Sequence, residues 1–117
     1  MSAKIHKATV TEANLNYVGS ITIDAELLDR TGLLPNEKVL VVSNTSGARL
    51  ETYIIEGERG SGYIGVNGAA AHLIGEGEEI IIIAFTLATE PVEPKAILVD
   101  ANNRFVSDLT EQQAAFA

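Results

Sequence analysis

The sequence predicts a mainly β protein, a small compact β-barrel of six or seven short strands with two short helices. Short runs rich in Val, Ile and Thr recur along the chain, and Gly, Asn and Pro turns separate them. Sustained helical periodicity is nearly absent. Short strands at this spacing fit a barrel better than a sheet that alternates with helices.

Two strands and a helix are predicted in the N-terminal part of the chain. Residues 5–11 alternate in polarity and are rich in β-branched side chains, and residues 20–23 form a short strand entered from a glycine turn. The helix follows Asp24, whose carboxylate suits an N-cap, and ends at Thr31-Gly32. Its two adjacent leucines are expected to face the core.

A pair of strands and a glycine-rich loop are predicted in the middle of the chain. Residues 38–43 and 49–55 flank the Asn44-Thr45-Ser46-Gly47 turn. Residues 57–65 contain four glycines and are expected to form a loop that leads into another strand.

The last third of the chain is predicted to hold one helical turn and two strands. Residues 69–73 form the helical turn, and the chain then returns to a strand at residues 79–87. Residues 95–100 form the last strand and Asn102-Asn103 a turn, while residues 109–116 form a terminal helix or a frayed tail.

Composition restricts the classes of function. The 117 residues fit a single domain spanning 1–117, and the absence of cysteine excludes disulfides, thiolate metal sites and a cysteine nucleophile. A net charge of −8 argues against nucleic-acid binding. The longest apolar run, residues 80–85, is far shorter than the roughly 20 residues of a membrane helix, so no membrane partner is expected. An intracellular location is expected.

The tetrapeptide Tyr17-Val18-Gly19-Ser20 is the most informative motif. In a Gly-Ser bond the serine hydroxyl can attack the preceding carbonyl, because glycine has no side chain to hinder its approach. A second Gly-Ser pair at Gly60-Ser61 shows that the dipeptide alone has little meaning. The first pair stands out through the segments around it, which are Lys4-Ile5-His6-Lys7, Thr52-Tyr53, Glu58-Arg59-Gly60-Ser61 and Val66-Asn67-Gly68-Ala69-Ala70-Ala71-His72.

Taken in this order, these segments resemble the pyruvoyl-dependent aspartate 1-decarboxylases. The resemblance is strongest over residues 17–23 and 66–72 and is looser beyond Pro91. It implies a double-psi β-barrel, a homotetramer and a cytoplasmic enzyme. Some members of that family need a partner protein for maturation, so a maturation factor is among the implied partners.

The resemblance implies that the chain cleaves itself between Gly19 and Ser20. Attack of the Ser20 hydroxyl on the Gly19 carbonyl turns the amide into an ester, and β-elimination then releases the Gly19 carboxylate and leaves dehydroalanine. Hydrolysis of the tautomeric imine releases ammonia and leaves a pyruvoyl group. The products are a chain of residues 1–19 and a chain of residues 20–117 that begins with this cofactor.

In that family the pyruvoyl carbonyl forms a Schiff base with L-aspartate and takes up the electrons released when carbon dioxide leaves. The product is β-alanine, a precursor of pantothenate. Tyr53 matches the family's proton donor, and a phenol keeps its proton at neutral pH. From its position alone, Tyr53 reads as a half-buried strand residue.

Other matched residues are implied to bind substrate. Thr52 matches a residue that contacts substrate and assists the serine rearrangement, although its side chain should point to the face opposite Tyr53. The segment Gly68-Ala69-Ala70 matches the substrate-binding stretch, where backbone N–H groups approach a carboxylate. Lys4 and Arg49 match the cations for the two carboxylates of aspartate.

The two histidines and Tyr17 have less specific matches. His6 is expected near the cleavage site, His72 as a structural hydrogen-bonding residue, and Tyr17 as a residue that orients the processing loop. Neither histidine lies in a metal-ligand pattern, so no metal is expected.

Two alternatives remain open from the sequence. A small β-barrel that never cleaves and serves as a binding or assembly module predicts that Ser20→Ala has no effect. A pyruvoyl enzyme with another amino-acid substrate predicts that glutamate reacts as well as aspartate.

Overall fold

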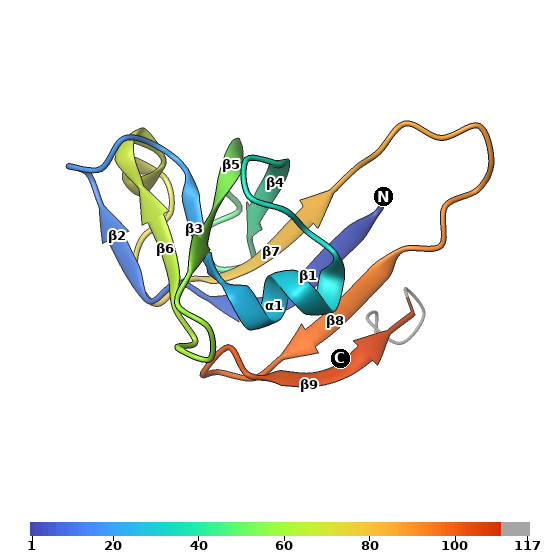
Figure 1. Ribbon diagram of the computed structural model, residues 1–117. Helices are drawn as coiled ribbons and strands as arrows, with labels where there is room; N and C mark the ends of the chain where they lie inside the picture. Colours follow the sequence, from blue (N-terminus) through green and yellow to red (C-terminus); the bar gives the residue numbers. More distant parts are fainter. Residues whose placement is uncertain (111–117) are drawn as a thin grey trace.

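A computed structural model of the protein describes residues 1–110 and confirms a mainly β architecture (Figure 1). Its elements in chain order are β1 (Ala3–Thr9), β2 (Glu12–Asn14), β3 (Ile21–Asp24), α1 (Ala25–Thr31), β4 (Lys38–Ser43), β5 (Arg49–Gly57), β6 (Ile64–Asn67), the 3₁₀ helix η1 (Gly68–His72), β7 (Glu79–Ala84), β8 (Lys95–Val99) and β9 (Phe105–Leu109). Neither helix of this part of the chain has the length and hydropathy of a membrane span.

The strands of the described residues form one mixed sheet with the order β2-β6-β3-β5-β4-β7-β1-β8-β9. The interior strand β1 runs antiparallel to β7 and parallel to β8. Strand β3 is parallel to β5 and antiparallel to β6. The predicted cleavage segment, residues 17–20, therefore connects an edge strand, β2, to an interior strand, β3.

The sheet contains more strands than the six or seven predicted, because β2 and β9 were missed. β2 is only three residues long, Glu-Ala-Asn, and carries no β-branched side chain; it exists through its parallel pairing with β6. β9 pairs antiparallel with β8 and alternates between half-buried and exposed residues. Of the predicted helix or tail at residues 109–116, Leu109 ends β9 and residues 111–116 lie outside the described residues.

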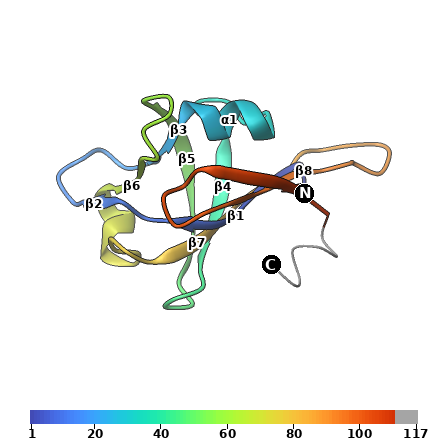
Figure 2. The ribbon, with the colours of Figure 1, turned by 90° about the horizontal axis from the view of Figure 1, so that it is seen from below.

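The predicted helix is confirmed at both ends. The side chain of Asp24 accepts a hydrogen bond from the Glu26 N–H at 2.9 Å, and Gly32 ends the helix in the left-handed conformation at φ 73°. Leu27 and Leu28 are buried, as predicted. Figures 1 and 2 show α1 lying on one side of the sheet.

Most predicted strand boundaries lie within two residues of the observed ones. β4 matches the prediction, whereas β1 starts and ends two residues earlier than predicted and β5 runs two residues further. β7 ends at Ala84 rather than Leu87, because its pairing with β4 stops at Ile83 and its pairing with β1 stops at Ala84, opposite Ala3. Residues 85–94 instead extend from the body of the molecule as a long loop (Figures 1 and 2). The predicted helical turn at residues 69–73 is present as η1.

The core is aliphatic, as the composition predicts. It joins the inner faces of the central strands to the buried leucines of α1. Its largest fully buried side chains are Ile5, Ile21, Ile23, Leu27, Ile54, Ile64, Ile74, Ile80, Ile82, Ile97, Val10 and Val39.

Candidate functional site

The Gly19-Ser20 bond lies in a strained turn between β2 and β3. Gly19 has φ 48° and Ser20 has φ 87°, a left-handed conformation that a residue with a side chain rarely adopts. Such a conformation costs about 1–3 kcal/mol and is found mostly at functional sites. The Ser20 side chain is buried, with 1% of the residue exposed, so the strained serine is held inside the protein.

Asn67, the last residue of β6, holds Ser20 through both its backbone and its side chain. Its N–H donates to the Ser20 carbonyl oxygen at 3.0 Å. Its Nδ2 donates to Ser20 Oγ at 3.1 Å and to Thr22 Oγ1 at 3.0 Å. The sequence prediction quoted the block containing Asn67 but gave this residue no role. The available signal in the sequence was a polar side chain directly before the Gly68 turn. It did not identify the partner, because Ser20 is 47 residues away in the chain.

Gly68 packs directly against the Gly19-Ser20 turn. A Cβ atom at Gly68 would lie 2.5 Å from Gly19 N, 2.8 Å from Gly19 Cα and 2.9 Å from the Tyr17 carbonyl oxygen. Its φ of 69° also favours glycine. Of the two alanines that follow on η1, Ala69 is exposed and Ala70 is half-buried. The predicted stretch therefore starts beside the cleavage bond.

Tyr53 lies beside the same turn, and Thr52 faces away from it. Tyr53 Oη donates to the Val18 carbonyl oxygen at 3.4 Å, and its ring lies within ordinary contact of a Cβ placed at Gly19. Tyr53 is 39% exposed. Thr52, half-buried, alternates to the opposite face of β5 and pairs with Val39. Both residues lie in the regular part of β5, where successive side chains alternate between faces.

The two predicted cations do not join this group within one chain. Arg49 is exposed on the same face of β5 as Tyr53, four residues earlier, which places it about 13 Å along the strand. Lys4 lies on β1 between Ile83 of β7 and Ala96 of β8, and in sheet order three strands separate β1 from β3.

The two histidines lie at different places. His6 is buried on β1, whereas His72 is exposed at the end of η1. Within residues 1–110, no group of three His, Cys, Asp or Glu side chains is arranged to hold a metal ion.

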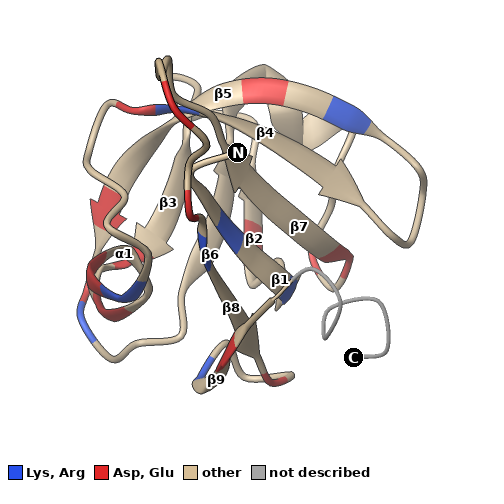
Figure 3. Cartoon of the chain, turned by 90° about the vertical axis from the view of Figure 1, so that its right-hand side faces the viewer, with Lys and Arg blue, Asp and Glu red and all other residues tan. Residues whose placement is uncertain are grey.

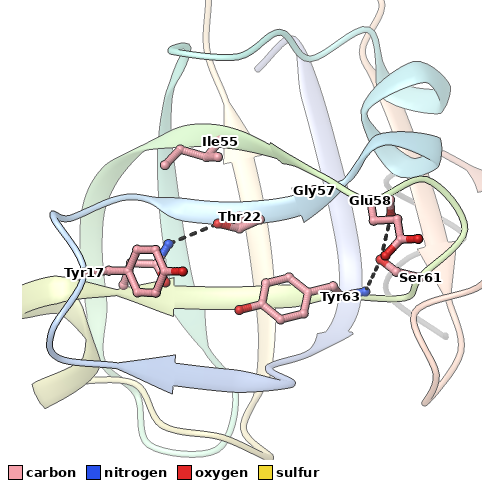
Figure 4. Close-up of a pocket in the computed structure, with 8 residues that line it drawn as sticks. Tyr17, Thr22, Ile55, Gly57, Glu58, Ser61 and Tyr63 are labelled. Carbon is pink, nitrogen blue, oxygen red and sulfur yellow. Dashed lines mark hydrogen bonds between the residues drawn. The ribbon is translucent and has the colours of Figure 1, made fainter.

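A pocket of about 370 Å³ opens beside Asn67 (Figure 4). Figure 4 shows the rings of Tyr17 and Tyr63 and the Thr22 side chain among the residues that line this pocket. Serine, threonine and tyrosine hydroxyls dominate its polar lining, together with one carboxylate. Its lining residues are Tyr17, Thr22, Ile55, Gly57, Glu58, Ser61, Tyr63 and Asn67.

Tyr63 is fixed by a carboxylate from the N-terminal segment. Its Oη donates to Glu12 Oε2 at 2.7 Å. Burial, the hydrogen bond to Glu12 and the negative charge of Glu12 raise the pKa of Tyr63 to about 12. Tyr63 therefore remains a protonated hydrogen-bond donor at neutral pH and links β2 to the start of β6.

The chain is similar to known proteins over nearly its whole length. The profile of the family described as "Aspartate decarboxylase" matches residues 1–106. The aspartate 1-decarboxylase of Geobacillus sp. (strain WCH70) is 55% identical, covering 97% of this chain and 93% of its own length. The aspartate 1-decarboxylase of Carboxydothermus hydrogenoformans is 61% identical, and the match covers 91% of this chain and 87% of that protein. The aspartate 1-decarboxylase of Bacillus subtilis is 54% identical, and the match covers 97% of this chain and 93% of that protein.

Proposed function

Because the chain belongs to the aspartate decarboxylase family, its activity is that of an aspartate 1-decarboxylase, and we propose that this activity depends on a pyruvoyl group made from Ser20. Removal of the carboxylate at carbon 1 of L-aspartate gives β-alanine and carbon dioxide. The family match favours this function over the uncleaved binding module.

The observation that supports the proposal most is the strained conformation of a buried serine. Ser20 has φ 87°, and the preceding Gly19 also lies in the left-handed region. The α-carbon of a pyruvoyl group is trigonal and carries no amide nitrogen, so conversion removes the strain that an L-residue bears there. Asn67 N–H, which donates to the Ser20 carbonyl oxygen, can keep that bond after conversion. The residues around position 20 therefore fit the group.

The proposed self-cleavage uses atoms that lie close together. Ser20 Oγ attacks the Gly19 carbonyl carbon; the new C–O bond replaces the C–N bond and an ester results. The Ser20 Cβ–Oγ bond then breaks, which releases the Gly19 carboxylate and leaves dehydroalanine. The dehydroalanine tautomerises to an imine, and water hydrolyses the imine. The nitrogen leaves as ammonia, and a carbonyl group remains at the α-carbon. Asn67 Nδ2, donating to Ser20 Oγ, restrains the side chain that must attack.

In the mature site, the pyruvoyl group supplies a carbonyl that accepts the electron pair left by the departing carboxylate. Tyr53, beside Gly19, is the proposed proton donor to the carbon that loses carbon dioxide. Gly68, Ala69 and Ala70 are proposed to present backbone N–H groups to a substrate carboxylate. Thr52 remains a proposed participant in processing and binding, although it faces away from Ser20 in this chain.

We propose further that the enzyme is a homotetramer with double-psi β-barrel subunits. Two cations are needed for the two carboxylates of aspartate, and Lys4 lies three strands away from β3 in sheet order. A neighbouring copy that supplies Lys4 and Arg49 completes the site. The cytoplasmic location and a maturation factor remain predictions from the family resemblance.

Mass spectrometry of the purified protein under denaturing conditions tests the cleavage. We expect one chain of residues 1–19 and one of residues 20–117, the second lighter by one ammonia than simple hydrolysis gives. Ser20→Ala should remain a single chain without decarboxylase activity. A wild-type protein that decarboxylates aspartate while uncleaved would overturn the proposal. Equal activity on glutamate would overturn the substrate assignment.

A further inference from the structure

Part of the wall of the pocket beside Asn67 is formed by a loop that connects β5 to β6. Residues 58–62, called here the 58–62 loop, contribute Glu58 and Ser61 to the lining of the pocket. We propose that Asp24 is a positioning residue for this loop, and that it thereby sets the affinity of the mature enzyme for aspartate without affecting self-cleavage. The second half of this inference rests on the proposed function.

The carboxylate of Asp24 anchors the loop from inside the protein. Asp24 is 2% exposed. Its Oδ1 accepts from Gly60 N at 2.9 Å, in addition to the helix-capping bond from Glu26 N, and its Oδ2 accepts from Gly62 N at 2.8 Å. Its own N–H donates to the Tyr63 carbonyl oxygen at 3.0 Å. A buried carboxylate needs such donors, since leaving it without hydrogen bonds is costly.

The capping bond and the loop bonds use the carboxylate differently. Oδ1 serves the helix and the loop together, whereas Oδ2 serves only the loop, through Gly62. An N-cap requires a single acceptor oxygen, and Asn is as good an N-cap as Asp. The second oxygen therefore has a role that the helix does not require.

Two further sets of contacts hold the same loop. Arg59 forms ion pairs with Glu26 at 3.2 Å and Asp29 at 2.6 Å, both on α1, where Figure 3 shows acidic residues in red. From the β8–β9 turn, Asn103 Nδ2 donates to the Gly62 carbonyl oxygen at 2.8 Å, and an Arg104 guanidinium N–H donates to the Gly60 carbonyl oxygen. The ion pairs of Arg59 are exposed and contribute little, whereas the bonds of Asp24 and Asn103 are buried. Of these two buried anchors, Asp24 carries the charge, which strengthens its hydrogen bonds.

The contacts around Ser20 predict which step depends on Asp24. Ser20 Oγ is held by Asn67, which belongs to β6 and not to the 58–62 loop. Two side chains of the loop, Glu58 and Ser61, line the pocket beside Asn67 (Figure 4). We take this pocket as part of the space for substrate, because Asn67 lines it and also bonds Ser20. Loosening the loop should therefore alter this space and leave the attacking hydroxyl in place.

Asp24→Asn separates the two roles of this residue. The Asn side-chain oxygen keeps the helix cap, but its NH₂ group replaces the acceptor that faces Gly62 N–H. Limited trypsin digestion of the cleaved enzyme, with fragments identified by mass, reports loop opening at Arg59. We expect cleavage there to be about ten-fold faster. Steady-state kinetics should show a KM for aspartate raised about five-fold, with kcat within about two-fold, because uniform binding is lost. The half-time of self-cleavage should stay within about two-fold.

Gly32→Ala is the matched control, because it disturbs the other end of the same helix. Gly32 has φ 73° and is not among the residues that line the pocket, and an added Cβ meets only the Lys95 side chain at 3.9 Å. It should weaken α1 without faster cleavage at Arg59 and without a change in KM.

Three results would overturn the inference. Unchanged trypsin cleavage at Arg59 in Asp24→Asn excludes Asp24 as the anchor. Faster cleavage with an unchanged KM excludes the loop as a determinant of affinity, and parallel changes in Gly32→Ala reduce the effect to helix stability. A wild-type enzyme without decarboxylase activity would overturn the proposed function and the substrate half of the inference, whereas the trypsin comparison would still decide whether Asp24 anchors the loop.

Discussion

At the scale of single residues, the cleavage turn shows how closely packed neighbours constrain one peptide bond. Ser20 is buried, has a strained backbone and accepts a hydrogen bond from Asn67. Gly68 packs so closely against Gly19 that a side chain at position 68 would clash with it. Three residues from two separate segments therefore fix the geometry of the bond that is proposed to break. Pre-organisation of this kind lowers the entropy that must be lost before reaction.

Gly68→Ala should slow self-cleavage at least about ten-fold, because the new Cβ displaces Gly19 from the position at which Ser20 can attack. Gly47→Ala is the control: Gly47 has φ 79°, but nothing lies within 4 Å of its added Cβ. The control should lose only about 1 kcal/mol of unfolding free energy. A time course of chain masses measures cleavage, and urea unfolding in a Ser20→Ala background measures stability. Cleavage of Gly68→Ala at the wild-type rate would show that this contact does not matter.

At the scale of elements, local signals predicted what local interactions determine. The helix was predicted because Asp24 and Gly32 cap it within its own segment. The β4–β5 hairpin was predicted for the same reason, since its turn residues are contiguous with its strands. β2 was missed, because only its partner β6, about fifty residues later, makes it a strand.

The candidate site was predicted to a similar degree. The family resemblance selected Gly19, Ser20, Tyr53 and Gly68, which the structure brings together. The role of Asn67 was not predicted, because it depends on hydrogen bonds across 47 residues of sequence. The position of the 58–62 loop likewise depends on distant partners.

One element-scale contact makes stability depend on pH. Glu78, at the entry to β7, accepts hydrogen bonds from Ser43 Oγ at 2.6 Å and from Gly75 N–H. These bonds, together with one from Ser46, lower the pKa of Glu78 below the ordinary value for glutamate. The charged form is thus favoured in the folded state. Its contribution is present at neutral pH and is lost as the pH falls through the acidic range in which glutamate protonates.

Glu78→Gln should lower the unfolding free energy by about 1–3 kcal/mol at pH 7, because hydrogen bonds to a charged acceptor are lost. The difference in unfolding free energy between the variant and its parent should shrink as the pH falls toward 3, because the Glu78 carboxylate becomes protonated in that range. Urea unfolding at several pH values, in a Ser20→Ala background, measures it. Glu76→Gln removes an equal charge from the same turn, where the side chain is exposed, and serves as the control. A difference that stays constant with pH would contradict the assignment.

At the scale of the whole molecule, the residues proposed to contact substrate are not gathered around one pocket of the described chain. The pocket beside Asn67 carries a carboxylate, Glu58, and no cation among its lining residues within the described part of the chain. Lys4 lies on β1, on the far side of β5, β4 and β7 in sheet order. Assembly is therefore proposed to be a condition of activity and not only of stability.

Co-expression of two inactive variants tests this proposal. Lys4→Ala and Ser20→Ala should each be inactive alone, yet together they should recover about a quarter of wild-type activity, since random mixing places intact Lys4 next to an intact site in that fraction of sites. Tyr53→Phe with Ser20→Ala should not recover activity, because Tyr53 contacts Gly19 of its own chain. Absence of recovery in the first mixture, with mixed oligomers verified by mass, would place Lys4 in its own subunit's site.

The position of β1 has a further consequence for the life of the protein. β1 belongs to the segment before Gly19, yet it lies inside the sheet between β7 and β8 and contributes Ile5 and Ala8 to the core. With the proposed cleavage of the Gly19-Ser20 bond, the native sheet would contain two polypeptides, and recovery from full unfolding would become a second-order encounter that slows on dilution. The intact precursor folds as one chain without that penalty. The proposed order is therefore folding first and cleavage second, and a cleaved molecule that unfolds in dilute solution would lack the covalent link between β1 and the rest of the sheet.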